Sequence, residues 1–182
     1  MALLPKGTFS GNYPPSPIDP KPDVRFILEF SHRPEELPPG LPNIELAQRL
    51  EEAEEIEGVL PNFASHSIVR ALEYIRSDVK ITRVFEGPSA SGMSENTGTY
   101  GELEQGMGWM AELGYSRPEI ITSGYNIGNV VLQAVKLGMN PIVPDKLPCS
   151  FDPRSDQPWT RNWSMWVGAA IPRIYKLRKS GH

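Results

Sequence analysis

The sequence predicts an α/β protein of the three-layer, Rossmann-like type, with a mainly parallel sheet between two layers of helices. Short apolar segments typical of buried strands recur along the chain, and longer segments with helical spacing of apolar residues lie between them. Parallel strands need such crossover segments, and the helices then cover both faces of the sheet. No internal repeat of about 20–50 residues is visible, so we do not expect a solenoid.

The length of 182 residues is that of one ordinary domain, and the 39% of hydrophobic residues can fill one core. Ten of the 19 prolines lie within the first 42 residues. Because proline removes backbone donors, we expect residues 1–22 to form an extended arm and residues 23–182 a single α/β domain. The arm could be a disordered tail, or it could lie on the body or on a second subunit, which would make the protein a homo-oligomer.

The first half of the chain predicts two strands and two helices. Residues 24–30 form an apolar run typical of a buried strand. Asn43 can cap a helix over residues 44–57, whose polar face carries six glutamates and is expected to be solvated. A second amphipathic helix is expected to begin at Asn62, and residues 80–85 predict the second strand.

The second half predicts two further strands and three helices. Residues 94–113 have helical spacing but contain several glycines, which predicts a close approach to a neighbouring backbone. Strands are expected over residues 118–123 and 140–143, with a helix over residues 127–137 between them. A final tryptophan-rich helix is expected over residues 159–177, with a kink at its proline.

Charge and composition exclude several classes of function. The net charge of −4 and the calculated pI of about 5.4 predict no broad basic surface, so we expect no binding to nucleic acid. No apolar run reaches the ~18–20 residues of a membrane span, and the first residues do not resemble a secretory signal. The single cysteine, Cys149, predicts a reducing, cytoplasmic location. One cysteine and three unclustered histidines predict no metal centre.

Candidate site residues follow the predicted strands, because ligands of parallel α/β sheets bind beyond the carboxyl ends of the strands. The richest loop, residues 86–99, places hydroxyls and an amide ahead of a helix start, which favours an anionic or polar ligand. Ordinary caps and turns use the same residue types, so a surface loop is the alternative. Glu86 would orient a ligand hydroxyl or act as a general base. The ligand-binding residues would be His32, Arg33, Ser94, Asn96, Thr97, Ser123, Tyr125 and Asn126.

Two of these loops resemble the YdcF-like family, the Rossmann-like domain also seen in the SanA and ElyC envelope proteins. The matching residues are Glu86, Ser94-Glu95-Asn96-Thr97 and Thr122-Ser123-Gly124-Tyr125, within residues 80–140. The chain departs from the family pattern at Asn126, where the family usually has His, and at Asn129, near the usual Arg. The resemblance implies a nucleotide-like ligand such as S-adenosylmethionine, or a link to envelope metabolism, but no settled reaction.

A second resemblance predicts an enzyme. The stretch from Gly98 to Leu103, Gly-Thr-Tyr-Gly-Glu-Leu, is similar to the Gly-Thr-x-x-Glu-Leu stretch of nucleoside deoxyribosyltransferases. That resemblance implies that Glu102 attacks the sugar and forms a covalent glycosyl intermediate. A non-catalytic binding or interaction protein is the third alternative, and the sequence leaves open whether the chain is an enzyme.

Overall fold

The computed structural model describes residues 21–85 and 98–169, and these form an α/β structure around one parallel sheet. The sheet has four strands in the order β3-β2-β1-β4, and every pairing is parallel. The strands are β1 (Val24–Ile27), β2 (Asn62–Ser65), β3 (Arg83–Phe85) and β4 (Pro118–Ile121). The predicted fold class, an α/β sandwich with a mainly parallel sheet, is therefore confirmed.

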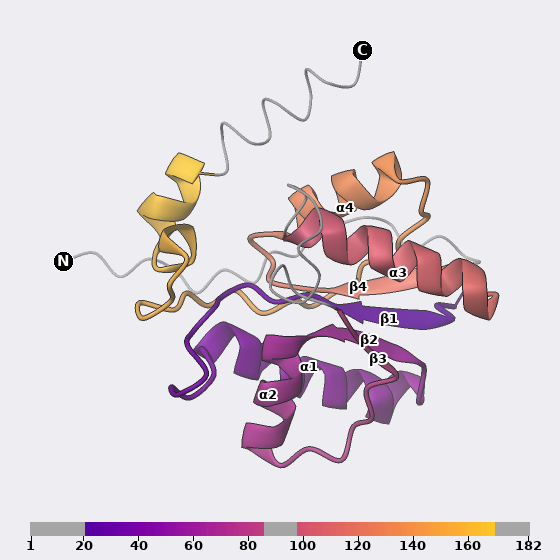
Figure 1. Cartoon of the computed structure of the whole chain (residues 1–182), viewed down its shortest axis with the longest axis horizontal. Coiled ribbons are helices and arrows are strands. Elements are labelled where there is room, and N and C mark those ends of the chain that lie inside the picture. The colour runs from indigo at the N-terminus through magenta and orange to yellow at the C-terminus, as the bar shows by residue number, and fades with distance from the viewer. Residues whose placement is uncertain (1–20, 86–97, 170–182) are drawn as a thin grey trace.

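Four α-helices cover the two faces of the sheet. Figure 1 shows α1 and α2 below the sheet and α3 and α4 above it. Each face has its own apolar cluster: Leu50 of α1 and Ile68 of α2 belong to one, and Leu103 of α3 and Val130 of α4 to the other. The helices are α1 (Leu41–Glu57), α2 (His66–Ile75), α3 (Thr99–Leu113) and α4 (Ile127–Lys136). A 3₁₀ turn (Pro158–Thr160) and a helical segment over residues 163–169 follow.

The glycine-rich helix α3 lies close to the sheet at Gly106. A Cβ atom there would lie 2.5 Å from Cε2 of Phe26, a fully buried residue of β1. Only glycine leaves room for the phenylalanine ring at this distance. Gly108, two residues later, has open space around it. Gly106 thus lets α3 approach the Phe26 side chain, rather than a neighbouring backbone, and Gly108 has no such neighbour.

A buried ion pair lies near the start of β1. Arg25 is fully buried, and its Nε donates to Glu119 of β4 at 2.8 Å. The rest of its guanidinium donates to Glu57 at 3.1 Å and to the carbonyl oxygens of Ala53 and Gly58. Buried charges are tolerated when they are paired and hydrogen-bonded in this way. The network fastens the C-terminus of α1 to the centre of the sheet.

Several expected elements differ in the structure. The strand β2 was not expected, because its four residues run directly into α2 and the sequence was interpreted as one helix from Asn62. Residues 140–143 contribute an isolated parallel bridge, from Ile142 to Glu119, instead of a strand. Asn43 does not cap α1, which begins two residues earlier, at Leu41. The expected arm and the end of the final helix lie outside the described residues.

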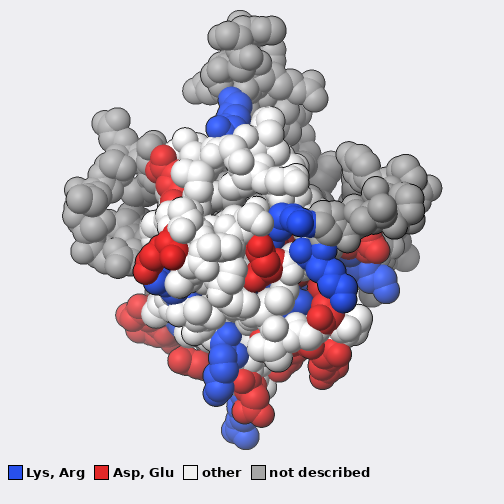
Figure 2. Space-filling view, turned by 90° about the vertical axis from the view of Figure 1, so that its right-hand side faces the viewer, with Lys and Arg blue, Asp and Glu red and all other residues white. Residues whose placement is uncertain are grey.

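None of the helices in the described part of the chain is long and apolar enough to cross a bilayer. Figure 2 shows the face that lies to the right in Figure 1. On it, the acidic and basic side chains of the described residues are interspersed over the lower half. The described part of this face therefore shows no continuous basic field there.

Candidate functional site

The carboxyl ends of the four strands meet at one edge of the sheet, called here the carboxyl edge. The chain goes from β1 to β2 and β3 on one side and then returns to place β4 on the other side of β1. Strand order therefore reverses between β1 and β4, which is where open α/β sheets characteristically bind ligands. In Figure 1 this edge lies to the left, as does the segment around residues 150–165.

Two acidic side chains and two serines form a cluster at the carboxyl edge, which we call the carboxyl cluster: Glu29, Ser65, Ser67 and Glu102. Glu29 lies two residues beyond β1, Ser65 ends β2, and Glu102 lies in the first turn of α3. The Ser65 hydroxyl accepts the backbone N–H of Glu29 at 3.1 Å and donates to Oε1 of Glu102. Ser67 lies near the Glu29 side chain and lowers the pKa of its carboxyl group. Three segments far apart in the sequence thereby meet at one serine-lined site.

The electrostatics of the carboxyl cluster favour protonation. Burial, together with the nearby charge of Glu29, raises the pKa of Glu102 to about 7, although the hydrogen bond from Ser65 acts in the opposite direction. Burial also raises the pKa of Glu29, against the effects of Ser67, His32 and His66. A carboxyl group that titrates near neutral pH can donate or accept a proton under ordinary conditions. Perturbed acids of this kind are enriched at functional sites.

The loop after β1 is held in place by side-chain contacts that reach its backbone. Asn43 Oδ1 accepts the backbone N–H groups of Phe30 and Ser31, and its Nδ2 donates to the Ser31 carbonyl at 2.7 Å. Arg33 forms a two-pronged ion pair with the buried carboxylate of Asp152. Arg33 therefore fastens the segment around residue 152 to this loop, and this contact was not visible in the sequence. Its role in ligand binding stays a prediction.

His32 lies at the rim of the carboxyl cluster. Its Nδ1 atom is 4.0 Å from Oε1 of Glu29, and its side chain is 52% exposed. A protonated imidazole at this distance would favour the ionised form of the carboxylate. The structure therefore places His32 at the expected edge of the site, with a free path to solvent.

The loop after β4 holds the other predicted residues within the described chain. Ser123 is buried, and its carbonyl accepts the N–H groups of Asn126 and Ile127 as α4 begins. Tyr125 stacks on Phe151 with ring centroids 4.4 Å apart and also contacts Phe30, Trp163 and Trp166. Tyr125 thus belongs to an aromatic cluster at the reversal of strand order. The buried hydroxyl of Thr122 has no hydrogen-bond partner in the described structure.

Four predicted residues, Glu86, Ser94, Asn96 and Thr97, lie outside the described residues, so their roles stay predictions. The sequence analysis missed Glu29, Ser65 and Ser67. Glu29 was included in the first strand, where a lone acid in an apolar run was the available signal. Ser65 and Ser67 could not be selected, because the strand that places them at the carboxyl edge was itself not expected.

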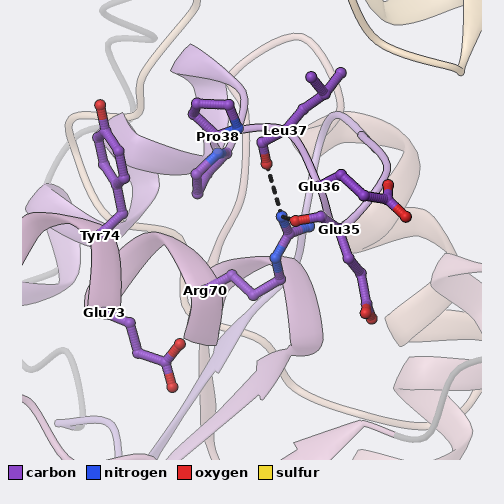
Figure 3. Close-up of a pocket in the computed structure, with 8 residues that line it drawn as sticks. Glu35, Glu36, Leu37, Pro38, Arg70, Glu73 and Tyr74 are labelled. Carbon is purple, nitrogen blue, oxygen red and sulfur yellow. Dashed lines mark hydrogen bonds between the residues drawn. The ribbon is translucent and has the colours of Figure 1, made fainter.

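A shallow hollow of about 450 Å³ lies between the loop over residues 35–39 and α2. Figure 3 shows Arg70 reaching from α2 to this loop. Its guanidinium donates to the backbone carbonyls of Arg33, Pro34, Glu35 and Leu37. The other charged residues of its lining are glutamates: Glu35, Glu36 and Glu73. Because the single cation is engaged by the loop, the hollow is poorly suited to an anionic ligand.

The described residues contain no group of three or more His, Cys, Asp or Glu side chains that could hold a metal ion. Comparison of the chain with protein-family models, curated proteins and solved structures found no match. The candidate site therefore rests on the geometry of the carboxyl edge and on the resemblances of its sequence.

Proposed function

We propose that the carboxyl edge binds a nucleoside-like or nucleotide-like small molecule and that Glu102 exchanges a proton with it. The observation that carries this proposal is the position of Glu102, which is held by Ser65 beside Glu29 with a pKa of about 7. Carboxylates at this edge of Rossmann-like sheets accept hydrogen bonds from ribose hydroxyls. Two acids would repel a phosphate, so the carboxyl cluster suits the sugar part of such a ligand.

Glycosyl transfer or hydrolysis at Glu102 is the enzymatic form of this proposal. The Gly98–Leu103 resemblance suggests it, and the perturbed carboxyl group supports it. Near neutral pH the protonated form can donate to a departing base, and the ionised form can attack the sugar carbon. The raised pKa favours the first role, because a nucleophile must be ionised.

Binding without turnover is the form favoured by the YdcF-like resemblance. Thr122-Ser123-Gly124-Tyr125 lies directly beyond β4, beside the reversal of strand order, and this supports it. S-adenosylmethionine is then the first ligand to test. Asn96→Ala and Thr97→Val should each weaken binding by about 5- to 150-fold, the cost of one buried hydrogen bond.

The two forms can be separated with one set of proteins. We would incubate purine and pyrimidine nucleosides and nucleotides with the wild-type protein and follow release of the base by chromatography. Binding of the same compounds and of S-adenosylmethionine would be measured by calorimetry. Glu102→Gln is the test variant, and Glu104→Gln, an exposed glutamate on the same helix, is the matched control.

Turnover that falls by about 100-fold or more in Glu102→Gln and persists in Glu104→Gln would support the enzymatic form. Binding without turnover would support the YdcF-like form. If no compound binds or reacts, the proposal that this edge recognises nucleoside-like molecules is wrong.

A further inference from the structure

The turn between β2 and α2 holds two acidic side chains with two serines. Ser65 and Ser67 are two residues apart, and each lies near a different carboxyl group. Ser65 donates to Glu102, which comes from α3, and Ser67 lies near Glu29, which follows β1, and lowers its pKa. Ser65 also accepts the backbone N–H of Glu29 at 3.1 Å, so one hydroxyl is shared by the two acidic residues. The junction of β2 and α2 therefore places the Glu102 carboxyl group beside the backbone of Glu29.

The two carboxyl groups have different surroundings. Two histidines face Glu29: His32 from the loop after β1, with Nδ1 4.0 Å from Oε1 of Glu29, and His66 at the start of α2. His66 also lies 3.7 Å from the exposed Glu35. For Glu102 the charged neighbour is Glu29, which disfavours its ionised form. If one of the two groups carries a proton, these neighbours place it on Glu102.

We propose that Glu29 and Glu102 act as one carboxyl pair that shares a proton, with Glu102 as its protonated member and Ser65 and Ser67 as positioning residues. Close carboxyl groups cannot both ionise freely, and two such groups with different environments take different roles. This inference deepens the proposed function, because it assigns a second acid, Glu29, to the same site.

Such a pair fits a substrate with a bond between a sugar carbon and a nitrogen or oxygen leaving group. Glu102 gives its proton to the leaving atom, which departs with the electron pair of the broken bond. The oxygen of a water molecule bonds to the sugar carbon, and the Glu29 carboxylate takes the proton that this water loses. The net reaction is hydrolysis, and the pair ends with the proton on Glu29, from which it returns to Glu102 through solvent. Paired acids perform this division of roles in glycoside hydrolysis.

A titration that needs no substrate tests the pair. The full chain would be labelled with ¹³C at the glutamate carboxyl carbons, and the signals of Glu29 and Glu102 would be assigned from Glu29→Gln and Glu102→Gln. Folding of each variant would be checked from its amide spectrum. We expect Glu102 to titrate at a higher pH than Glu29 in the wild-type protein.

The coupling between the two groups is the decisive measurement. Glu29→Gln should lower the titration midpoint of Glu102 by about one pH unit or more, the strength that defines interacting sites. Ser65→Ala should raise the midpoint of Glu102, and Ser65→Thr, which keeps the hydroxyl, should restore it. Ser67→Ala should raise the midpoint of Glu29, and Glu102→Gln should lower it, which provides a second test if Glu29→Gln does not fold.

An unchanged midpoint for Glu102 in Glu29→Gln would overturn the pair. If that variant does not fold, a midpoint for Glu29 that Glu102→Gln leaves unchanged would overturn it, because the coupling is reciprocal. Because the titration needs no ligand, the pair can be confirmed even if no nucleoside is turned over. It can likewise fail while turnover is observed, so the two proposals are tested separately.

Discussion

Replacing Glu102 by glutamine should stabilise the folded protein above neutral pH. The ordinary pKa of a glutamate, 4.5, is raised to about 7 at this position by burial and by the charge of Glu29. An acid whose pKa is raised on folding binds protons more tightly in the folded state, so folding takes up protons between these two values. Its contribution to stability is complete below pH 4.5 and is lost as the pH rises through about 7.

The size of the effect follows from the shift. A rise of the pKa from 4.5 to about 7 corresponds to about 3 kcal/mol in the free energy of unfolding. Glu102 is partly exposed, and solvent screening reduces the expected effect to about 2 kcal/mol. For a chain of this size, about 2 kcal/mol raises the melting temperature by roughly 4–8 °C. Glutamine keeps the size of the side chain and an oxygen that can accept the Ser65 hydrogen bond.

Urea unfolding of the wild-type protein, Glu102→Gln and Glu104→Gln, measured between about pH 5 and pH 8, would test this prediction. The free energy of unfolding of Glu102→Gln should exceed that of the wild type by an amount that grows with pH. The control variant should follow the wild-type curve, because Glu104 is exposed. The reasoning is refuted if Glu102→Gln is no more stable than the wild type at pH 8, or if the two curves stay parallel.

Three further predictions concern the fold. Gly106→Ala should lower stability by about 1–3 kcal/mol through overpacking, whereas Gly108→Ala, in open space, should raise it by up to about 1 kcal/mol; equal effects in thermal unfolding would contradict this. Arg25→Met should cost about 3–5 kcal/mol in urea unfolding, because it leaves Glu119 buried without its partner; a loss below about 1 kcal/mol would mean that the ion pair is dispensable. Deleting residues 1–20 should leave the melting temperature unchanged; a large fall would make this segment part of the core or of a subunit interface.

The fold class could be predicted because it depends on periodicity, which is a local property of the sequence. The run over residues 24–30 and the helical spacing over residues 127–137 each identify their element without knowledge of any neighbour. The strand β2 could not be predicted, because its four residues continue directly into α2 and no turn marks the boundary between strand and helix. Because β2 was not expected, the end of this strand, where Ser65 lies, was absent from the expected carboxyl edge.

The candidate site could be predicted only in part, because its contacts join distant segments. Glu102 was selected from a local motif. Its neighbour Glu29 lies two residues beyond β1, and its neighbour Ser65 is the last residue of β2. Nothing in the local sequence of either residue indicates that it lies near Glu102. Arg33 follows β1, as the sequence predicts, but its ion pair with Asp152 spans 119 residues and cannot be predicted from either segment alone.

The two ends of β1 show how charge separates stability from function in this molecule. At one end, the guanidinium of Arg25 is buried and paired with Glu119 and Glu57, so its charge is compensated within the fold. Beyond the other end, the carboxyl groups of Glu29 and Glu102 lie near serine hydroxyls and two imidazoles. Burial disfavours the ionised form of both groups. Compensated charges stabilise the native state, whereas uncompensated ones cost free energy that a bound ligand can recover by donating hydrogen bonds. Arg25→Met and Glu102→Gln should therefore change stability in opposite directions above neutral pH.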